Sequence, residues 1–285
     1  MTALDPRLNA IRPDLADARL RGRVEARHFA QGREACVRTP VADLRRRAGS
    51  DQPLETQALF GEAVRVFEDD GEGWSWVQLE RDRYVGWMPS ASLVDGAPPA
   101  ATHRVRTSRT LVFPGPDIKQ PPMHDLPLGA RVRARGEAED RNARYALIEP
   151  FGAVVMQHLE PADAVAPDFV AVAELFLGVP YLWGGKSALG IDCSGLVQLA
   201  LAQGGLEAPR DTDLQFRDLG TALPDGGGLQ RGDLAFWPGH VGIMLDGERL
   251  LHANAHHMMT AVEPLAEAVA RTSAKGTAFL GLKRL

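Results

Sequence analysis

Short runs of alternating apolar and polar residues, rich in aromatic and β-branched side chains, set the strongest limit on how residues 33–97 can fold. The runs are Val64–Phe67, Trp74–Leu79 and Tyr84–Met88, and the turn Asp69-Asp70-Gly71 separates the first two. Alternation with a period of two places every second side chain on one face of a strand. Short strands joined by tight turns are typical of a small antiparallel barrel, which we expect here.

A second copy of this pattern follows a proline- and alanine-rich segment at residues 97–101, which predicts a linker. Gly61–Val66 resembles Gly129–Ala134 at an offset of 68 residues. Tyr84–Met88 resembles Pro150–Val154 at an offset of 66 residues. Two similar offsets predict a duplicated barrel of about 65 residues.

The pattern becomes helical after Pro167 and then strand-like again. Apolar residues follow helical spacing over 169–176, and a second helical run begins near Cys193 and ends at Gly204-Gly205. Three strand-like runs come next, at residues 234–237, 241–245 and 249–253. A helical half followed by an antiparallel meander predicts an α+β domain.

The chain is therefore expected to have four parts. Helical spacing of apolar residues near the N-terminus predicts an arm or a short helical segment, and Pro6 and Pro13 limit the length of any helix. The expected parts are the arm at 1–32, the first barrel at 33–97, the second barrel at 98–164 and the α+β domain at 165–285.

Composition and charge narrow the location and the partners. The chain is 45% hydrophobic and 24% charged, and it has no run of about 18 apolar residues, so we expect a folded protein without membrane insertion. The first residues show no apolar signal segment, and Cys36 and Cys193 are the two cysteines, which favours a cytoplasmic protein. The net charge is −5, with 9 basic and 13 acidic side chains in residues 166–285. A nucleic-acid partner is not expected.

The segment Gly190–Val197 carries the most specific chemical signal. It places Cys193 in the first turn of a helix, where unpaired N–H groups and the helix dipole favour an anion. A free thiol has a pKa of about 8.5, and lowering it by about two units would make the thiolate the main form at neutral pH. The alternative is a buried cysteine that acts as a small hydrophobic residue. The neighbouring glycines favour a nucleophile, because they allow close approach of the backbone.

A thiol nucleophile needs a base, and His240 and His252 lie on consecutive predicted strands. If Asp246–Glu248 forms a three-residue loop, facing residue numbers sum to 494 and both imidazoles lie on one face. A two-residue loop would place them on opposite faces. A base–orienter pair therefore predicts the three-residue loop or a bulge.

His256 and His257 follow His252 closely, which makes a metal site an alternative function for these histidines. Neither a carboxylate nor a cysteine accompanies this spacing in the sequence. We therefore expect no bound metal and no other cofactor.

Several segments together resemble the signatures of NlpC-type, papain-like cysteine peptidases of bacterial cell walls. In the C-terminal part, roughly 167–285, they are Pro180–Gly185, Asp192–Val197, Gly239–Gly242 and Leu251–Asn254. Upstream, Leu59–Glu62 and Tyr84–Trp87 resemble the bacterial SH3-like domains of one subgroup. That subgroup is the γ-D-glutamyl-L-diamino-acid endopeptidases of the dipeptidyl-peptidase VI type. The resemblance implies a papain-like α+β catalytic domain preceded by two SH3-like barrels.

The resemblance also implies a role for each catalytic residue. Cys193 would attack the carbonyl carbon, His240 would take and return the proton, and His252 would orient His240. The backbone N–H of Cys193, helped by Tyr181, would bind the oxyanion. The scissile bond would join the γ-carboxyl of D-Glu to a diamino acid. The reaction would release L-Ala-D-Glu from short muropeptide-derived peptides during cell-wall recycling.

The subgroup acts on a free N-terminal L-Ala, whose ammonium group needs carboxylates in a closed pocket. The resemblance implies contacts from Trp183, Asp192, Ser194, Asp211 and Thr212 in the catalytic domain, and from Glu55 and Tyr84 in the first barrel, with Glu62 as the alternative acid. Structural roles compete with two of these contacts. Asp192 is also a suitable helix cap, and Asp211 lies in a turn-like segment.

Two other functions stay open from the sequence. The first is a Cys-His amidase or acyltransferase on another substrate, because the motifs define the nucleophile and not the leaving group. The second is an inert protein whose SH3-like domains bind wall peptides. The intact set of Cys193, His240 and His252 argues against the second.

Overall fold

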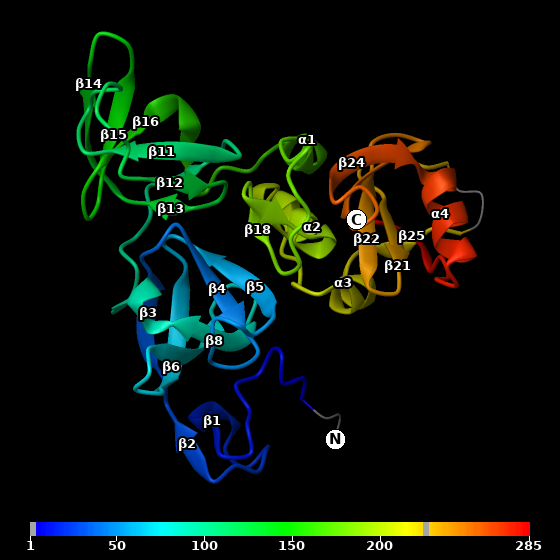
Figure 1. Ribbon diagram of the computed structural model, residues 1–285, viewed down its shortest axis with the longest axis horizontal. Coiled ribbons are helices and arrows are strands. Elements are labelled where there is room, and N and C mark those ends of the chain that lie inside the picture. Colours follow the sequence, from blue (N-terminus) through cyan, green and yellow to red (C-terminus); the bar gives the residue numbers. More distant parts are fainter. Residues whose placement is uncertain (1–3, 225–227) are drawn as a thin grey trace. The chain divides into compact units, whose positions relative to one another are not determined.

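Two units make up the chain, a β-rich unit, Met1–Asp163, and an α+β unit, Ala164–Leu285. The computed structural model describes residues 4–224 and 228–285 (Figure 1). Among these residues, no helix is both long enough and apolar enough to cross a membrane.

Seven strands form the sheet of the first barrel, in the order β5-β4-β8-β7-β6-β3-β9. Its paired strands are antiparallel, as predicted, and alternate side chains such as Val64, Val66 and Met88 enter one buried core. The strands are β3 Arg33–Val37, β4 Val41–Arg45, β5 Leu54–Leu59, β6 Ala63–Asp69, β7 Trp74–Leu79, β8 Val85–Pro89 and β9 Leu93–Asp95.

Residues 4–32 of the N-terminal arm contain no α-helix, so of the two expected forms the structure shows an arm. Strand β1 (Leu15–Asp17) pairs in parallel with β2 (His28–Ala30), and a short 3-10 helix, Ala18–Leu20, follows β1. Leu8 packs against the core of the first barrel, and its carbonyl oxygen accepts a hydrogen bond of 2.8 Å from the side chain of Gln78. Contacts with the barrel therefore override a weak helical pattern.

The second β region repeats the local order of the first. A 3-10 helix, Met156–His158, lies between β16 and β17, just as Ser90–Ser92 lies between β8 and β9, 66 residues earlier. The preceding residues have nearly equal backbone angles, φ −57° and ψ 124° at Pro89 and φ −61° and ψ 125° at Val155. This agreement supports the predicted duplication. The strands are β10 His103–Val105, β11 Arg109–Phe113, β12 His124–Pro127, β13 Arg131–Val132, β14 Ala134–Glu139, β15 Arg144–Ile148, β16 Ala153–Val155 and β17 Leu159–Pro161.

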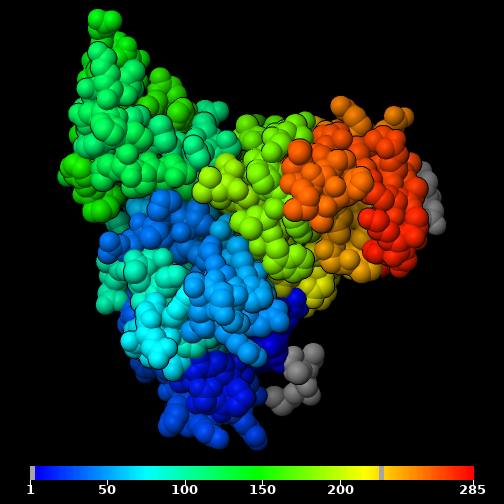
Figure 2. Space-filling view, viewed as in Figure 1, coloured from blue at the N-terminus to red at the C-terminus, as the bar shows by residue number. Residues whose placement is uncertain are grey.

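A close backbone contact joins the two β regions. The N–H of Arg131 donates a hydrogen bond of 3.0 Å to the carbonyl oxygen of Phe60, whose side chain packs against the core of the second region. Gly61 has φ +82°, and a Cβ there would lie 2.3 Å from the carbonyl oxygen of Arg131. Only glycine fits this approach. Figure 2 shows the atoms of the two regions in contact, in blue to cyan and in green.

The α+β unit is built on an antiparallel sheet with strand order β20-β25-β21-β22-β23-β24. Helix α2 packs against β22 and β23, and α4 packs against β24 (Figure 1). The elements are α1 Phe169–Glu174, β18 Lys186–Ser187, β19 Gly190–Ile191, α2 Cys193–Gln203, α3 Thr212–Asp218, β20 Thr221–Ala222, β21 Leu234–Trp237, β22 His240–Met244, β23 Arg249–Asn254, β24 Met259–Pro264, α4 Leu265–Ala274 and β25 Gly281–Arg284. The two predicted helices and three predicted strands are confirmed.

The register between β22 and β23 confirms the predicted three-residue loop. Ile243 pairs with Leu251 and Met244 pairs with Leu250, so each pair of residue numbers sums to 494. The carboxylate of Asp246 accepts hydrogen bonds from the N–H groups of the two residues that follow Gly247, at 2.9 and 2.8 Å, and these bonds close the loop.

Candidate active site

Helix α2 begins at Cys193 because Asp192 caps it. The Asp192 Oδ1 accepts a hydrogen bond of 2.7 Å from the N–H of Gly195. The Cys193 Sγ lies 4.0 Å from the carbonyl oxygen of Gly239, directly before β22. Among the described residues, no hydrogen-bond acceptor faces the N–H of Cys193, so this donor is available to a bound ligand.

Burial changes the expected ionisation of Cys193. The side chain is 5% exposed, and burial, helped by the charge of Asp192, raises the pKa of the thiol to about 11. The N–H groups of Val241 and Ser194 and the cation of Arg210 act in the opposite direction but do not offset this. The prediction that the helix start holds the sulfur ionised is therefore wrong for the free site. Loss of hydration raises the pKa of the thiol by more than the N–H groups at the helix start lower it.

The two predicted histidines form a hydrogen-bonded relay with an acidic residue. His240 Nε2 lies 2.8 Å from His252 Nδ1, and His252 Nε2 lies 2.8 Å from Glu263 Oε1. A carboxylate only accepts, so His252 carries its proton on Nε2, and its Nδ1 accepts from His240 Nε2. The Nδ1 of His240 is then the unprotonated nitrogen that can take the proton of Cys193.

Both histidines are neutral at neutral pH. Burial, with a smaller effect from His252, lowers the pKa of His240 to about 3. Burial also lowers the pKa of His252 to about 4, although Glu263 opposes this. No hydrogen bond joins the Cys193 Sγ to the His240 ring in the part of the chain that the structure describes. Transfer of the thiol proton therefore requires a closer approach once substrate binds.

Glu263 and Arg271 are members of the site that sequence reasoning missed. Glu263 is 7% exposed on β24, and its Oε2 accepts a hydrogen bond of 2.6 Å from Arg271 Nη1 on α4. Burial alone would raise the pKa of Glu263, but Arg271 and His252 together lower it. Because β23 pairs His252 with Ala261 of β24, Glu263 lies diagonally across from His252. Predicting strand β24 from the alternation of its side chains would have identified Glu263.

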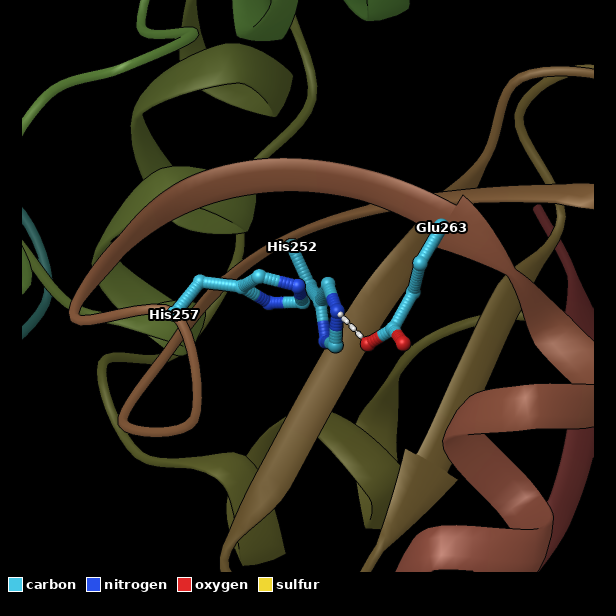
Figure 3. Close-up of side chains that lie close together, drawn as sticks. All are labelled: His252, His257 and Glu263. Carbon is cyan, nitrogen blue, oxygen red and sulfur yellow. Dashed lines mark hydrogen bonds and ion pairs between the residues drawn. The ribbon is translucent and has the colours of Figure 1, made fainter.

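His252, His257 and Glu263 could also be considered as metal ligands, since their ligand atoms lie within 4.8 Å of one another (Figure 3). Glu263 supplies the carboxylate that the sequence spacing lacked. Both ring nitrogens of His252 already form hydrogen bonds, and Arg271 already neutralises Glu263. A cation here would break the relay beside a guanidinium group. The geometry favours a proton relay over a metal centre.

Two predicted aromatic contacts lie close to Cys193 in the sequence but differ in exposure. Burial raises the pKa of Tyr181, and nearby Asp192 raises it further. Trp183 is 64% exposed and is free to form a wall for a ligand. The contacts of both residues with substrate remain predictions.

The Asp192 carboxylate forms several interactions within the protein. Besides capping α2, its Oδ2 accepts a hydrogen bond of 2.8 Å from the N–H of Gly184 and forms an ion pair of 2.7 Å with Arg210. Arg210 is 1% exposed, and it also donates a hydrogen bond of 2.8 Å to the hydroxyl of Ser194. This arrangement favours a structural role for Asp192. Thr212 begins α3 and is buried.

The residues predicted to bind substrate from the first barrel interact with other residues of that barrel. Glu55 on β5 forms an ion pair of 2.7 Å with Arg46. Tyr84 is 2% exposed and packs in the barrel core. The alternative acid, Glu62, is 5% exposed, and its Oε2 accepts a hydrogen bond of 3.0 Å from the N–H of Leu59. Glu62 therefore stabilises the barrel turn.

Comparisons with known proteins agree with this architecture. Residues 178–275 match the NlpC/P60 family, and residues 44–93 match the bacterial dipeptidyl-peptidase SH3 domain. The chain is 29% identical over 235 residues to a gamma-D-glutamyl-L-lysine dipeptidyl-peptidase of Bacillus subtilis, covering 72% of this chain and 73% of that protein. It is 27% identical over 245 residues to the protein of the same name from Bacillus cereus, covering 74% and 71%.

The fold is also found in a solved structure. An NlpC/P60 family protein from Bacillus cereus matches with a TM-score of 0.71 at 22% identity, covering 88% of this chain and 99% of that one. The match of residues 178–275 to the NlpC/P60 family and the shared papain-like fold indicate that the α+β unit is a cysteine peptidase domain of the NlpC/P60 type. The chain combines this peptidase domain with an N-terminal SH3 domain of the bacterial dipeptidyl-peptidase type. The resemblance predicted from the sequence is confirmed.

Proposed function

We propose that the protein cleaves the bond between the γ-carboxyl of D-Glu and a diamino acid in short peptidoglycan-derived peptides with a free N-terminal L-Ala. The observation that carries this proposal is the relay from Glu263 through His252 to His240, next to a cysteine at a helix start. The relatives named gamma-D-glutamyl-L-lysine dipeptidyl-peptidase support the choice of bond.

Acylation begins with transfer of the Cys193 proton to His240 Nδ1 as the sulfur attacks the γ-carbonyl carbon. The S–C bond forms, and the carbonyl oxygen becomes an oxyanion that the Cys193 N–H can bind. His240 then gives its proton to the leaving amino nitrogen of the diamino acid, and the C–N bond breaks. A thioester of L-Ala-D-Glu is left on Cys193.

Deacylation uses the same groups in reverse. His240 Nδ1 takes a proton from water, and the hydroxyl attacks the thioester carbon. The C–S bond breaks, the sulfur regains the proton from His240, and L-Ala-D-Glu leaves. A neutral His240 suits this role, because it must be unprotonated at the start of each half-reaction.

Glu263 acts in this proposal as a positioning residue. Its carboxylate holds the proton of His252 on Nε2, which in turn holds the proton of His240 on Nε2 and leaves Nδ1 free. It also stabilises the positive charge that His240 gains during proton transfer. The charge is buried, so its effect is only weakly screened by solvent.

The free amine of the substrate needs a carboxylate near the reacting cysteine. We infer that Asp192 and Asp211 are both candidates, although Asp192 also caps α2 and pairs with Arg210. Ser194, Thr212, Tyr181 and Trp183 are proposed to complete the peptide pocket.

The substrates proposed here are released peptides of wall recycling, and the proposed location is the cytoplasm. Cell fractionation with an antibody against the chain tests the location directly. Recovery in the soluble cell extract is expected, and recovery in the culture medium would contradict it.

The experiment compares L-Ala-γ-D-Glu-L-Lys with its N-acetylated form. We expect release of L-Ala-D-Glu from the free tripeptide and at least tenfold lower kcat/KM for the acetylated one, because acetylation removes the ammonium charge. Equal turnover of both would refute the free-amine requirement. Turnover of other amides or esters without turnover of either tripeptide would support a different Cys-His acyl transfer.

A further inference from the structure

A cavity of about 820 Å³ lies where the two β regions of Met1–Asp163 meet. Phe60 and Gly61 line it from the first region, and Ile148 and Phe151 line it from the second. None of its lining residues belongs to the candidate active site. The backbone contact between Gly61 and Arg131 fixes the junction, so the cavity is part of the folded unit.

Positive charge dominates the lining of this cavity. Arg38, Arg131, Arg133 and Arg135 line it, and Glu149 is the one acidic residue in the lining. The Oε1 of Glu149 lies 3.7 Å from the Nε of Arg133. Among the residues that the structure describes, none forms an ion pair with any of the other three arginines. The cavity therefore holds an unbalanced group of guanidinium donors.

Arg131 is exposed at the cavity, but its electrostatic position is unfavourable. Partial desolvation lowers its pKa, and the cations of Arg81 and Arg104 lower it further, against a weaker opposing effect of Glu62. These shifts mean that the charged form of Arg131 is destabilised where it stands. A bound anion would relieve this cost, since a guanidinium pairs with carboxylate or phosphate through two parallel hydrogen bonds.

Apolar side chains form the rest of the wall. Met123 is 48% exposed and Phe151 is 52% exposed, although both are large and hydrophobic. Val94, also half-exposed, contributes from the first region. The volume lies within the range of about 300–1,000 Å³ that is usual for small-molecule sites, and such sites combine apolar walls with a few charged groups.

We propose that this cavity binds a small organic anion that carries two or more carboxylate or phosphate groups on a partly apolar body. The arginines bind the anionic groups, and the Met123 and Phe151 side chains cover the apolar part. The site is separate from the catalytic residues, so binding does not depend on turnover.

Isothermal titration calorimetry on the full-length Cys193→Ala protein tests this proposal. The probes are the dicarboxylate glutarate, its uncharged diamide glutaramide and uridine diphosphate. Binding of the dicarboxylate or of the diphosphate, weakened by added salt, is expected, and the preferred probe tells carboxylate from phosphate. Failure of both anions to bind, or equal binding of the diamide, would overturn the proposal.

Variants separate this site from non-specific attraction and from the active site. Arg131→Gln and Arg38→Gln are each expected to weaken binding about tenfold or more, because each removes a charged pair of donors. Arg106→Gln is the matched control, since Arg106 is an exposed arginine of the second region outside the cavity. Thermal unfolding confirms that each variant is folded. Unchanged affinity in both cavity variants, or an equal loss in Arg106→Gln, would contradict the proposal.

Discussion

Replacing Glu263 with glutamine tests whether the buried carboxylate acts on catalysis through His252. The change keeps the size of the side chain and keeps an oxygen that can accept the His252 proton, now 2.8 Å away. It removes the negative charge that stabilises His240 when that ring becomes protonated. Arg271 is left without its partner, but its side chain is 21% exposed, so water can hydrate it.

The expected loss follows from the hydrogen bond itself. A hydrogen bond to a charged group contributes about 1.5–3 kcal/mol and a neutral one about 0.5–1.5 kcal/mol. The difference of about 1–1.5 kcal/mol acts mainly when His240 is charged, and about 1.4 kcal/mol corresponds to a tenfold change in rate. We therefore expect kcat of Glu263→Gln to fall about tenfold, with KM nearly unchanged.

The assay is release of L-Ala-D-Glu from the free tripeptide, with the rate of Cys193 alkylation by iodoacetamide as a second readout. We expect kcat to fall because it depends on His240 as the base, whereas the alkylation rate, which follows the thiolate fraction of Cys193, should change much less. Glu248→Gln is the matched control, since Glu248 is an exposed acid in the same unit with no described side-chain partner. A folded Glu263→Gln protein with wild-type kcat would refute the reasoning.

Three further predictions concern the same unit. The pKa of Cys193, raised to about 11 by burial, predicts that its alkylation rate climbs about tenfold per pH unit between pH 6 and 9, and a plateau across this range would show a preformed thiolate. The pKa of His252 lies near 4 in the folded protein and about 6.5 in the unfolded chain, so the unfolded state binds more protons below pH 6.5. The free energy of unfolding therefore decreases as pH falls, by about 2 kcal/mol between pH 7 and 5. Urea unfolding should show that His252→Gln lacks this contribution to the pH dependence. Asp192→Asn leaves the buried Arg210 without its charge partner. Urea unfolding is expected to show that the free energy of unfolding falls by about 3 kcal/mol. A fall below about 1 kcal/mol would mean that the ion pair does not stabilise the fold.

The sequence predicted the elements that have strong local signals. Helix α2 begins at the cysteine because a cap, a glycine and an apolar face coincide there. The expected pairing of His240 with His252 required a three-residue loop or a bulge between their strands, and the register confirms the three-residue loop. The sequence left an arm and a short helical segment open for the N-terminal residues, and Leu8 and Leu15 pack against the first barrel instead of forming a helical face.

The rest of the site depends on contacts that local patterns do not contain. Glu263 meets His252 only through the pairing of β23 with β24, and Arg271 reaches it from α4. Arg210 binds the Asp192 side chain across 18 positions of sequence. The ionisation of Cys193 also escaped prediction, because hydration loss depends on the packed surroundings and not on the helix terminus alone.

The most direct measurement is release of L-Ala-D-Glu from L-Ala-γ-D-Glu-L-Lys by three proteins: wild type, Cys193→Ala and Cys36→Ala. Cys36 is the other free thiol of the chain, and it lies buried on β3 of the first barrel. The account predicts full release by the wild type and by Cys36→Ala and no release above buffer by Cys193→Ala. Release by a folded Cys193→Ala protein at the wild-type rate would contradict the account.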